Sequence, residues 1–260
     1  MLSNNTINNA LYDDFFLEQT FNSPKMIAHS KNEIAWLTNK LKLKKESSIM
    51  DVACGAGRHL KAFVELGYMP NGIDSSPDCI RLAIKNCPEI SNQIKEENFL
   101  TNNPNLLIKY DLVFIAGASF GYDPSIQTNI QLLEKLLLIT SLNGHIAIQF
   151  LNKSWANSYV KTKITFWNEN PEYYILDKRE IQDCILKSDK LFIKKTELIQ
   201  KQYSDKVYMF TAQEIIEHIN SLTLKNGQQF ELLNTFDSFS SIPYNELTSA
   251  TPVIILKRVR

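Results

Sequence analysis

The sequence predicts an α/β protein with a mainly parallel, seven-stranded sheet, helices on both faces of that sheet, and an antiparallel β insertion. From residue 47 to residue 151, strand-like segments alternate with amphipathic helical segments, which is typical of right-handed βαβ crossovers. After Phe150 this alternation stops, and short stretches rich in Ile, Tyr and Phe follow up to a last helical segment. These two observations place the insertion between the fifth strand and the last helix.

The elements of the core follow from hydrophobic spacing and capping signals. Apolar residues at helical spacing predict a helix over 27–43, with Pro24 near its start. Ser76 is the expected N-cap of a later helix, with Pro77 at its first position. The expected core strands are 47–53, 69–74, 93–99, 110–117 and 145–151. The expected helices between them are 57–67, 75–86 and 124–142, the last closed by Asn143-Gly144.

The second half of the chain is expected to form a β-meander and then to complete the core. The turn signals Asn170-Pro171, Ser188-Asp189 and Ser204-Asp205 punctuate the meander. Thr211, followed by Glu214 three residues later, predicts a capping box at the start of the last helix. Two final strands are expected over 229–239 and 251–259. The chain then divides into an N-terminal helical cap (1–46), a core (47–151), the insertion (152–209) and the completion of the core (210–260).

Composition and charge exclude several classes of function. The 260 residues include 28 basic and 28 acidic side chains, and this balance argues against binding to nucleic acid. No signal-peptide pattern and no run of 18 apolar residues is present, so we expect a cytoplasmic protein that does not enter a membrane. The four cysteines and four histidines are scattered without metal-ligand spacing, so we expect neither disulfides nor a bound metal.

The stretch "IMDVACGAGRH" (49–59) joins the first expected strand to a helix through a turn of small residues. Such a turn lets backbone N–H groups approach a ligand closely. A P-loop would need a Gly-Lys-Ser/Thr ending, which is absent. A dinucleotide site would need G-x-G-x-x-G and an apolar residue where Asp51 stands. The stretch instead contains an acidic residue, Asp51, followed by Ala53, Gly55 and Gly57 at every second position.

This pattern resembles motif I of the class I S-adenosylmethionine (SAM)-dependent methyltransferases. Further matches are Asp74 in "GIDSS", Asn98-Phe99 in "ENFL", and "YDLVFIAGASFGY" after residue 109. The resemblance covers nearly the whole chain. With "DxACGxGRH", "SFGY" and the meander, it points to a subgroup of bacterial methyltransferases that act on small molecules or small peptides. It implies a Rossmann-like fold, with SAM as cofactor and S-adenosyl-L-homocysteine as product.

The resemblance also implies a set of cofactor contacts. Asp51 either caps the turn or binds the amino group of SAM, and Asp74 is expected to accept hydrogen bonds from both ribose hydroxyls. Arg58 and His59 are either surface residues or neighbours of the cofactor's carboxylate. Asn98 takes a position near adenine where the family usually has an acidic residue. The full expected set is Asp51, Ala53, Gly55, Gly57, Arg58, Asp74, Ser75, Asn98, Phe99, Ala116, Ser119 and Phe120.

The methyl acceptor is less clearly indicated. Tyr12 either packs an N-terminal helix or closes over the methionyl part of SAM, and Phe120 is either a cofactor neighbour or plain core. Tyr12 and Tyr122 are the catalytic candidates. No recognised base motif for nucleic-acid methylation is present, which argues against DNA-base, rRNA-cytosine and ribose targets. The acceptor contacts expected from their positions are Tyr122, Asn152, Trp155, Tyr173 and Arg179.

The function expected from the sequence is therefore transfer of a methyl group from SAM to an N or O atom of a small molecule, by a monomer or homodimer. Two alternatives stay open. One is a nicotinamide-dependent oxidoreductase on a similar fold, although the third motif glycine and a Tyr-x-x-x-Lys element are missing. The other is a SAM-binding protein without catalytic activity, whose cofactor site would look the same.

Overall fold

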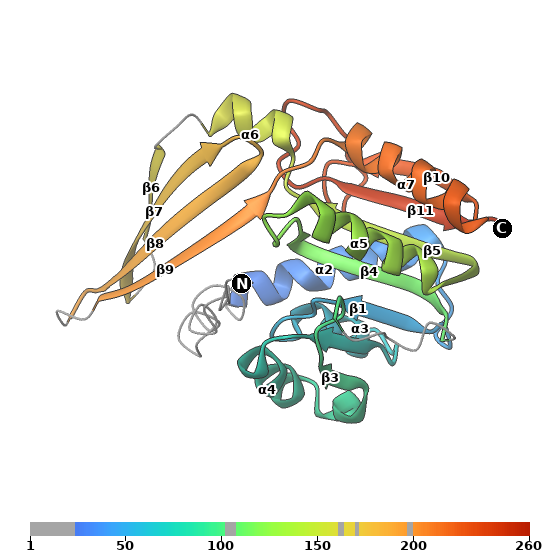
Figure 1. The fold of residues 1–260 in the computed structure, drawn as a ribbon. Coiled ribbons are helices and arrows are strands. Elements are labelled where there is room, and N and C mark those ends of the chain that lie inside the picture. Colours follow the sequence, from blue (N-terminus) through green and yellow to red (C-terminus); the bar gives the residue numbers. More distant parts are fainter. Residues whose placement is uncertain (1–23, 102–107, 161–163, 170–171, 197–199) are drawn as a thin grey trace.

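The computed structural model describes residues 24–101, 108–160, 164–169, 172–196 and 200–260, which form two sheets (Figure 1). The larger sheet has seven strands. In spatial order they are β10 (Phe230–Phe236), β11 (Val253–Arg258), β5 (Thr140–Phe150), β4 (Tyr110–Phe120), β1 (Ile49–Val52), β2 (Asn71–Asp74) and β3 (Ile94–Glu96). The strands β1 to β5 pair in parallel, and only β11 runs against its neighbours. The predicted fold class is confirmed.

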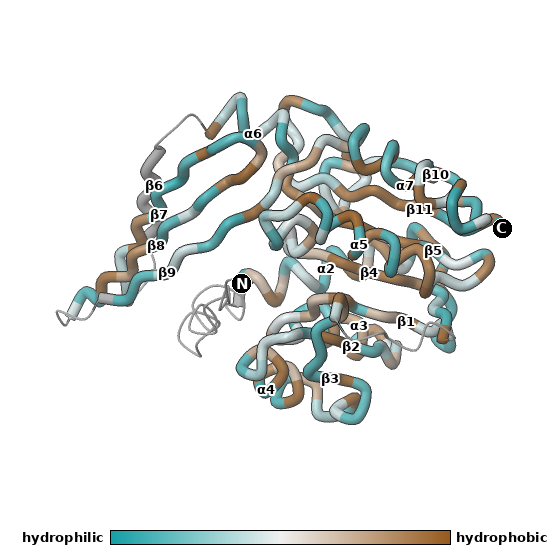
Figure 2. Tube along the Cα trace, viewed as in Figure 1, coloured by the Kyte–Doolittle hydropathy of each residue, from teal (hydrophilic) through white to brown (hydrophobic). Residues whose placement is uncertain are grey.

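Helices cover both faces of this sheet. The helices α5 (Ile126–Leu138) and α7 (Ala212–Asn226) pack on the face to which Val113 and Ile115 point. On the other face, α2 (Pro24–Leu41) and α3 (Arg58–Glu65) pack against Leu112 and Phe114. Helix α4 (Pro77–Asn86) packs beside α3. The middle strands β4, β5 and β11 carry runs of buried apolar residues, as expected of strands covered by helices on both faces (Figure 2).

The capping signals in the sequence correspond to real caps. The side chain of Ser76 accepts a hydrogen bond from the backbone N–H of Cys79 at the start of α4. Thr211 and Glu214 form the predicted capping box of α7 with both reciprocal hydrogen bonds. These local hydrogen bonds satisfy backbone groups that a helix end leaves unpaired, which is why they can be predicted from a few residues.

The predicted extent of the helix over 124–142 is wrong at its end. Helix α5 stops at Leu138, and β5 begins at Thr140. Thr140 is fully buried and pairs with Tyr110 of β4, so strand pairing overrides the helical spacing there. Two short elements were not expected: the 3₁₀ segment η2 (Pro88–Gln93) and helix α6 (Lys153–Tyr159).

The predicted insertion is a second sheet of four antiparallel strands. They are β6 (Ile164–Glu169), β7 (Tyr173–Gln182), β8 (Ile185–Lys194) and β9 (Gln200–Tyr208), in that order. The turns expected at Ser188-Asp189 and Ser204-Asp205 are wrong, because both pairs lie inside strands. The observed turn at Asp183 has a positive φ of 55°. The signal at Asn170-Pro171 lies outside the described residues.

Polar pairing across the strands explains the misread turns. The hydroxyl of Ser188 donates to Asp177 on β7 at 2.6 Å, and the hydroxyl of Ser204 donates to Asp189 on β8 at 2.5 Å. Turn-forming residues are thus used as cross-strand partners, which sequence spacing alone does not reveal.

The insertion leaves and rejoins the core at one place. The N–H of Phe210 donates to the carbonyl of Leu151, and the N–H of Lys153 donates to the carbonyl of Phe210. A third hydrogen bond, 2.6 Å from the N–H of Tyr208 to the carbonyl of Gly121, joins β9 to the end of β4. Among the described helices, none combines the length and the apolar character needed to cross a membrane.

Candidate active site

The carboxyl ends of β1 and β4 form the point where the strand order reverses. From β1 the chain proceeds to β2 and β3 on one side, and β4 and β5 lie on the other. In open α/β sheets, ligands bind outside the carboxyl ends of the strands at such a switch point. Most of the cofactor residues expected from the sequence lie along this edge.

The turn after β1 has an unusual backbone. Ala53, Gly55 and Gly57 all have positive φ angles, of 57°, 55° and 81°. A Cβ on Gly57 would lie 3.0 Å from the Cβ of Ala83 on α4, so only glycine lets this turn approach α4 so closely. At Gly55 a Cβ would meet no atom within 4 Å. The turn therefore presents bare backbone toward open space at Gly55.

Asp74, at the end of β2, braces this turn. Its Oδ2 accepts a hydrogen bond from the N–H of Gly55 at 2.9 Å, and its Oδ1 accepts one from the N–H of Ser76 at 2.9 Å. Burial raises the pKa of Asp74, and the backbone N–H groups of Ser76, Gly55 and Ser75 partly offset this effect. A carboxylate has about four acceptor sites, so Asp74 keeps acceptor capacity for a ligand hydroxyl.

Asp51 is a buried acid without a hydrogen-bond partner for one of its oxygens. The residue is 2% exposed, and its Oδ2 makes no hydrogen bond with the described residues. Burial raises the pKa of Asp51 well above its usual range, although the charge of Arg58 opposes this effect. An orphaned carboxylate oxygen is costly unless a ligand satisfies it, and a cationic ligand would favour its ionised form.

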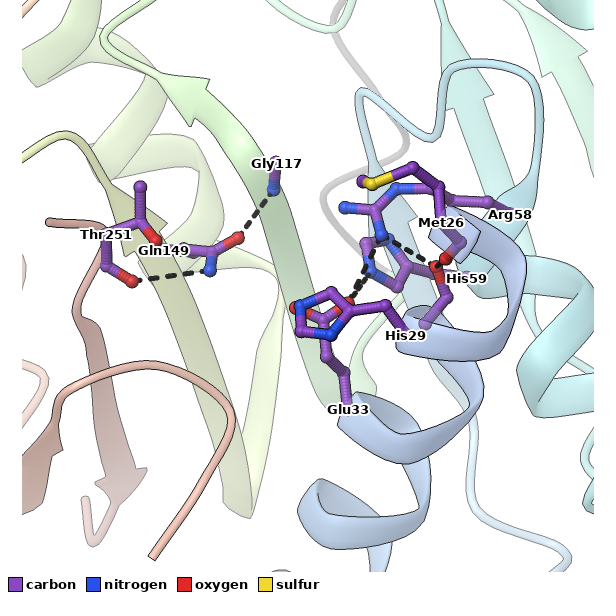
Figure 3. A network of polar contacts seen from close by, with 9 residues as sticks. Met26, His29, Glu33, Arg58, His59, Gly117, Gln149 and Thr251 are labelled. Atoms are coloured by element: carbon purple, nitrogen blue, oxygen red, sulfur yellow. Dashed lines mark hydrogen bonds and ion pairs between the residues drawn. The ribbon is translucent and has the colours of Figure 1, made fainter. Parts of the chain in front are cut away.

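Arg58 and His59 begin α3 and meet a cluster of polar residues on α2 (Figure 3). The Nη1 of Arg58 donates to the hydroxyl of Ser30 at 2.6 Å and to Oε2 of Glu33 at 3.2 Å. The same Oε2 lies 2.9 Å from Nε2 of His59. On the other carboxylate oxygen, Nε2 of His29 lies 3.2 Å from Oε1.

Burial and neighbouring charges together set the protonation states of this cluster. Burial lowers the pKa of His59 to about 4, and the charge of Arg58 acts in the same direction. Burial also works to raise the pKa of Glu33, but the hydrogen bond from His59 and the charges of His59 and Arg58 bring it below its usual value. At neutral pH the cluster therefore contains an ionised Glu33, a charged Arg58 and a neutral His59.

The end of β4 supplies the opposite wall of the site. The N–H of Gly117 donates to Oε1 of Gln149 at 2.8 Å, while Nε2 of Gln149 donates to the carbonyl of Thr251 at 3.3 Å. Gly117 has a φ of 68°, and a Cβ there would lie 3.6 Å from Nη2 of Arg58. Arg58 thus lies beside the β4 edge, at the switch point.

The remaining cofactor candidates differ in their surroundings. Ala116 and Phe120 are buried in the core, and the Phe120 ring packs 5.1 Å from that of Phe210. Ser119 is half-buried. At the end of β3, Phe99 is buried, whereas Asn98 is exposed and its Oδ1 accepts from the N–H groups of Leu100 and Thr101. Ser75 is exposed next to Asp74.

Two of the five acceptor candidates come together, and Arg179, Asn152 and Trp155 do not join them. Tyr122 and Tyr173 both pack against the buried pair Phe192 and Tyr203 on the inner face of the meander. Arg179 is paired within β7 to Asp177, with Nη2 to Oδ2 at 2.8 Å.

Asn152 and Trp155 have structural contacts. Asn152 is fully buried, and its amide caps α6 and donates to the carbonyls of Glu246 and Ser249. Trp155 packs at the base of the meander and stacks on Tyr159 at 6.0 Å. These contacts hold the insertion to the core and occupy the amide of Asn152 with backbone groups. Tyr12 lies outside the described residues.

Sequence reasoning missed Glu33, Ser30 and Gln149. Glu33 and Ser30 stand next to the apolar stripe of α2, so they are polar residues on a helix face that turns out to be buried. A polar or charged residue beside an apolar stripe is the sequence signal that could have identified them. Gln149 lies inside an apolar strand, where a polar residue also needs an explanation.

No family model matches the chain, and no curated protein matches it in sequence. Solved structures do match it. One is an S-adenosylmethionine-dependent methyltransferase from Clostridium acetobutylicum, with a TM-score of 0.76 at 12% identity, covering 94% of this chain and 96% of that one. Another is the CcbJ methyltransferase from Streptomyces caelestis, with a TM-score of 0.76 at 13% identity, covering 88% and 94%.

A third match is a SAM-bound amino pentose methyltransferase from Micromonospora echinaspora involved in calicheamicin biosynthesis. Its TM-score is 0.67 at 12% identity, and the match covers 95% of this chain and 98% of the other. At these identities the similarity establishes the fold: the chain has the architecture of these methyltransferases.

Proposed function

We propose that this protein is a SAM-dependent methyltransferase that moves a methyl group to an N or O atom of a small molecule. The observation that carries the proposal is the orphaned, buried Oδ2 of Asp51 beside a turn of bare backbone at the switch point. A carboxylate that lacks a partner calls for a cationic group, and the α-ammonium of SAM is one. The three solved methyltransferases of the same fold support the same reading.

The residues present fit this cofactor. The turn at Gly55 and Gly57 admits close approach of a ligand, and Asp74 has lone pairs for the two ribose hydroxyls. Phe99 and Asn98 at the end of β3 are proposed to lie along the adenine, with Ser75 beside them. Ser119 is proposed to lie near the sulfonium group, whereas Phe120 and Ala116 shape that wall from within the core.

SAM, when bound, supplies a methyl group made electrophilic by its sulfonium. The chain's own task is to align the acceptor, exclude water and hold the acceptor's proton where one must leave. Alignment alone is able to lower a barrier by roughly 7–11 kcal/mol. The Tyr208–Gly121 hydrogen bond joins β9 of the meander to the end of β4, and the acceptor is proposed to be aligned between these two parts.

We propose that the meander recognises the acceptor. Tyr122 and Tyr173 offer aromatic surface around Phe192 and Tyr203, and Arg179 with Asp177 offers charged hydrogen-bonding groups on the same face of β7. An aromatic and polar surface of this kind suits a small polar molecule that carries an amine or a hydroxyl. Tyr122 and Tyr12 remain the catalytic candidates.

Calorimetry tests the cofactor assignment. SAM and S-adenosylhomocysteine are expected to bind the purified chain, and NAD is not. Binding of NAD alone would point to the oxidoreductase alternative. Incubation of the chain and isotopically labelled SAM with a bacterial metabolite extract then tests catalysis, because a SAM-binding protein without activity would leave no labelled product.

An Asp74→Ala variant tests the ribose contact. Removal of two charge-assisted hydrogen bonds is expected to weaken SAM binding by about 100-fold. Asp78→Ala is the matched control, because Asp78 lies four residues away on α4 and pairs with Arg81 at the surface. Equal SAM affinity in Asp74→Ala and wild type would contradict the ribose assignment.

A further inference from the structure

The inner face of the meander carries charged side chains between two apolar clusters. One cluster is built on Phe192 and Tyr203, and the other contains Leu186 together with Leu151 of the core. Side chains two residues apart in a strand share a face, so both clusters and the residues between them lie on one face of the sheet. The residues between them, which we call the polar stripe, come from β7, β8 and β9: Asp177, Arg179, Ser188, Lys190 and Asp205.

Hydrogen bonds run along the polar stripe from strand to strand. The hydroxyl of Ser188 donates to Oδ1 of Asp177 at 2.6 Å, and Nη2 of Arg179 donates to Oδ2 of the same carboxylate at 2.8 Å. The Nζ of Lys190 donates to the hydroxyl of Ser188 at 2.8 Å and to Oδ2 of Asp205 at 2.7 Å. Asp177 and Ser188 are 7% and 4% exposed, so their polar groups serve the stripe itself.

Lys190 and Asp205 keep hydrogen-bonding capacity after these contacts. An ammonium has three N–H donors, and Lys190 uses two of them on described residues. A carboxylate accepts through both oxygens, and Oδ1 of Asp205 makes no hydrogen bond with the part of the chain that the structure describes. Each of the two side chains is 20% exposed, so a ligand is able to reach them. Because the two groups lie 2.7 Å apart, a ligand that uses both must carry an acceptor and a donor on neighbouring atoms.

Stability alone does not explain charges at this place. Charged side chains are rarely buried unless paired, and a partly buried ion pair adds little, since removal from water offsets much of its attraction. The position of the stripe suggests another role. Gly121 bonds to Tyr208 beyond one end of the stripe. Its neighbour Tyr122 packs against Phe192 and Tyr203 beyond the other end, so the stripe lies beside this catalytic candidate.

We propose that Lys190 and Asp205 bind two neighbouring polar groups of the methyl acceptor, and that the acceptor is a vicinal diol or a vicinal amino alcohol. This inference rests on the proposed function, because it takes methyl transfer as the reaction. One hydroxyl of the acceptor receives the open N–H of Lys190, and the adjacent hydroxyl or amine donates to Oδ1 of Asp205. The stripe holds two positive and two negative side chains, so it favours a ligand without a strong net charge. Lys190 and Asp205 thus determine specificity and take no part in the chemical step.

Periodate tests the chemical class of the acceptor before its identity is known, because it cleaves the carbon–carbon bond of vicinal diols and vicinal amino alcohols. A bacterial metabolite extract is treated with periodate, the excess is consumed with ethylene glycol, and the protein and labelled SAM are then added. The control extract receives ethylene glycol before periodate. Labelled product is expected from the control extract and not from the treated one. Undiminished product from the treated extract overturns the inference.

Asp205→Asn and Lys190→Met test the two residues. On a dilution series of the extract, each variant is expected to raise the apparent KM about tenfold or more, the loss expected of a charge-assisted hydrogen bond, and to keep a maximal rate within about threefold of wild type. Asp189→Asn and Lys187→Met are the matched controls, because Nζ of Lys187 and Oδ2 of Asp189 form an ion pair at 2.9 Å on the opposite face of the same sheet. Both controls are expected to follow wild type.

Calorimetry with S-adenosylhomocysteine separates this inference from the cofactor assignment. All four variants are expected to bind it within about twofold of wild type, because their changed side chains lie on the meander. An apparent KM in Asp205→Asn and Lys190→Met equal to that of wild type overturns the inference and leaves the proposed function standing. A loss of S-adenosylhomocysteine affinity as large as the rise in KM would mean general damage to the protein, which also overturns the inference. If wild type binds neither S-adenosylhomocysteine nor SAM, the proposed function itself fails.

Discussion

The motif turn contains two glycines that have similar backbone angles and different surroundings. Gly57 packs against Ala83, whereas Gly55 faces open space. Ala53 shows that a Cβ is tolerated at positive φ in this turn, since its own φ is 57°. The backbone angle alone therefore does not explain both glycines. Gly57 is required by helix packing, and for Gly55 we propose the approach of a ligand as the reason.

We expect Gly57→Ala to destabilise the protein by about 1–3 kcal/mol, because the new methyl group meets Ala83 in a backbone conformation that is already strained. Gly55→Ala is its matched partner and is expected to cost about 1 kcal/mol, with its main effect on SAM binding instead. Chemical denaturation measures the first effect, and calorimetry with SAM measures the second. Equal stability losses in the two variants would mean that the contact with Ala83 is unimportant.

His59 links stability to pH. Burial holds its pKa at about 4 in the folded state, below the usual value of 6.5. Between these two values the unfolded chain binds the proton and the folded chain does not, so stability falls as the pH falls. The raised pKa values of Asp51 and Asp74 act in the opposite direction, because the folded state takes up those protons more readily.

Wild type is therefore expected to lose up to about 3 kcal/mol from the His59 contribution between pH 6.5 and pH 4. His59→Gln removes the titrating group and keeps a donor for Glu33, so its stability is expected to change less over this range. Urea denaturation at several pH values gives the comparison. His29→Gln is the control, because His29 contacts the same carboxylate but is 57% exposed, and it is expected to follow wild type.

Gly121, at the end of β4, contacts both α5 of the core and β9 of the meander. Asn129 of α5 is buried, and its Oδ1 accepts from the N–H of Gly121 at 3.2 Å, while its amide nitrogen donates to the carbonyls of Asp123 and Ser125. Gly121 has a φ of 104°, and a Cβ there would lie 2.2 Å from the carbonyl oxygen of Tyr208. The glycine of "SFGY" is therefore required because β9 passes directly over it.

Gly121→Ala is expected to destabilise the protein by about 2 kcal/mol or more, because the backbone of β9 must move away from β4. Gly227→Ala is the control: Gly227 also has a positive φ, of 65°, but a Cβ there meets nothing within 4 Å. That variant is expected to cost about 1 kcal/mol. Thermal denaturation compares the two, and a Gly121→Ala variant no less stable than Gly227→Ala would contradict the close approach of β9.

At the scale of the whole molecule, the meander is an insertion in a core that is complete without it. The seven-stranded sheet has its two apolar layers from helices outside the insertion. The chain leaves the core at Leu151 and returns at Phe210, two residues joined by a backbone hydrogen bond. The loss of the insertion therefore leaves two chain ends that lie close together.

We expect a variant in which residues 160–206 are replaced by a Gly/Ser linker of about ten residues to fold and to bind S-adenosylhomocysteine. Methylation of any acceptor that the full chain accepts is expected to be lost, because the meander carries the proposed acceptor face. Circular dichroism and calorimetry measure folding and binding, and the labelled-SAM assay measures transfer. Undiminished transfer would show that the acceptor is recognised by the core.

The sequence by itself determined the features that depend on neighbouring residues. Strand and helix periodicity predicted the parallel sheet and the insertion, and short-range hydrogen bonding predicted the caps at Ser76 and Thr211. The register of Asp51, Ala53, Gly55 and Gly57 indicated a ligand cradle, because small residues and an acid at fixed spacing act within one turn of chain.

Only the tertiary structure decided the features that depend on residues far apart in the chain. The sequence predicts turns at Ser188 and Ser204, but both lie inside strands and bond to side chains on neighbouring strands. It predicts a helix at Thr140, which instead pairs with Tyr110 in the sheet. Glu33 lies 25 residues from Arg58 along the chain, and no local pattern joins the two. Burial gives such contacts their strength, and burial is a property of the folded chain as a whole.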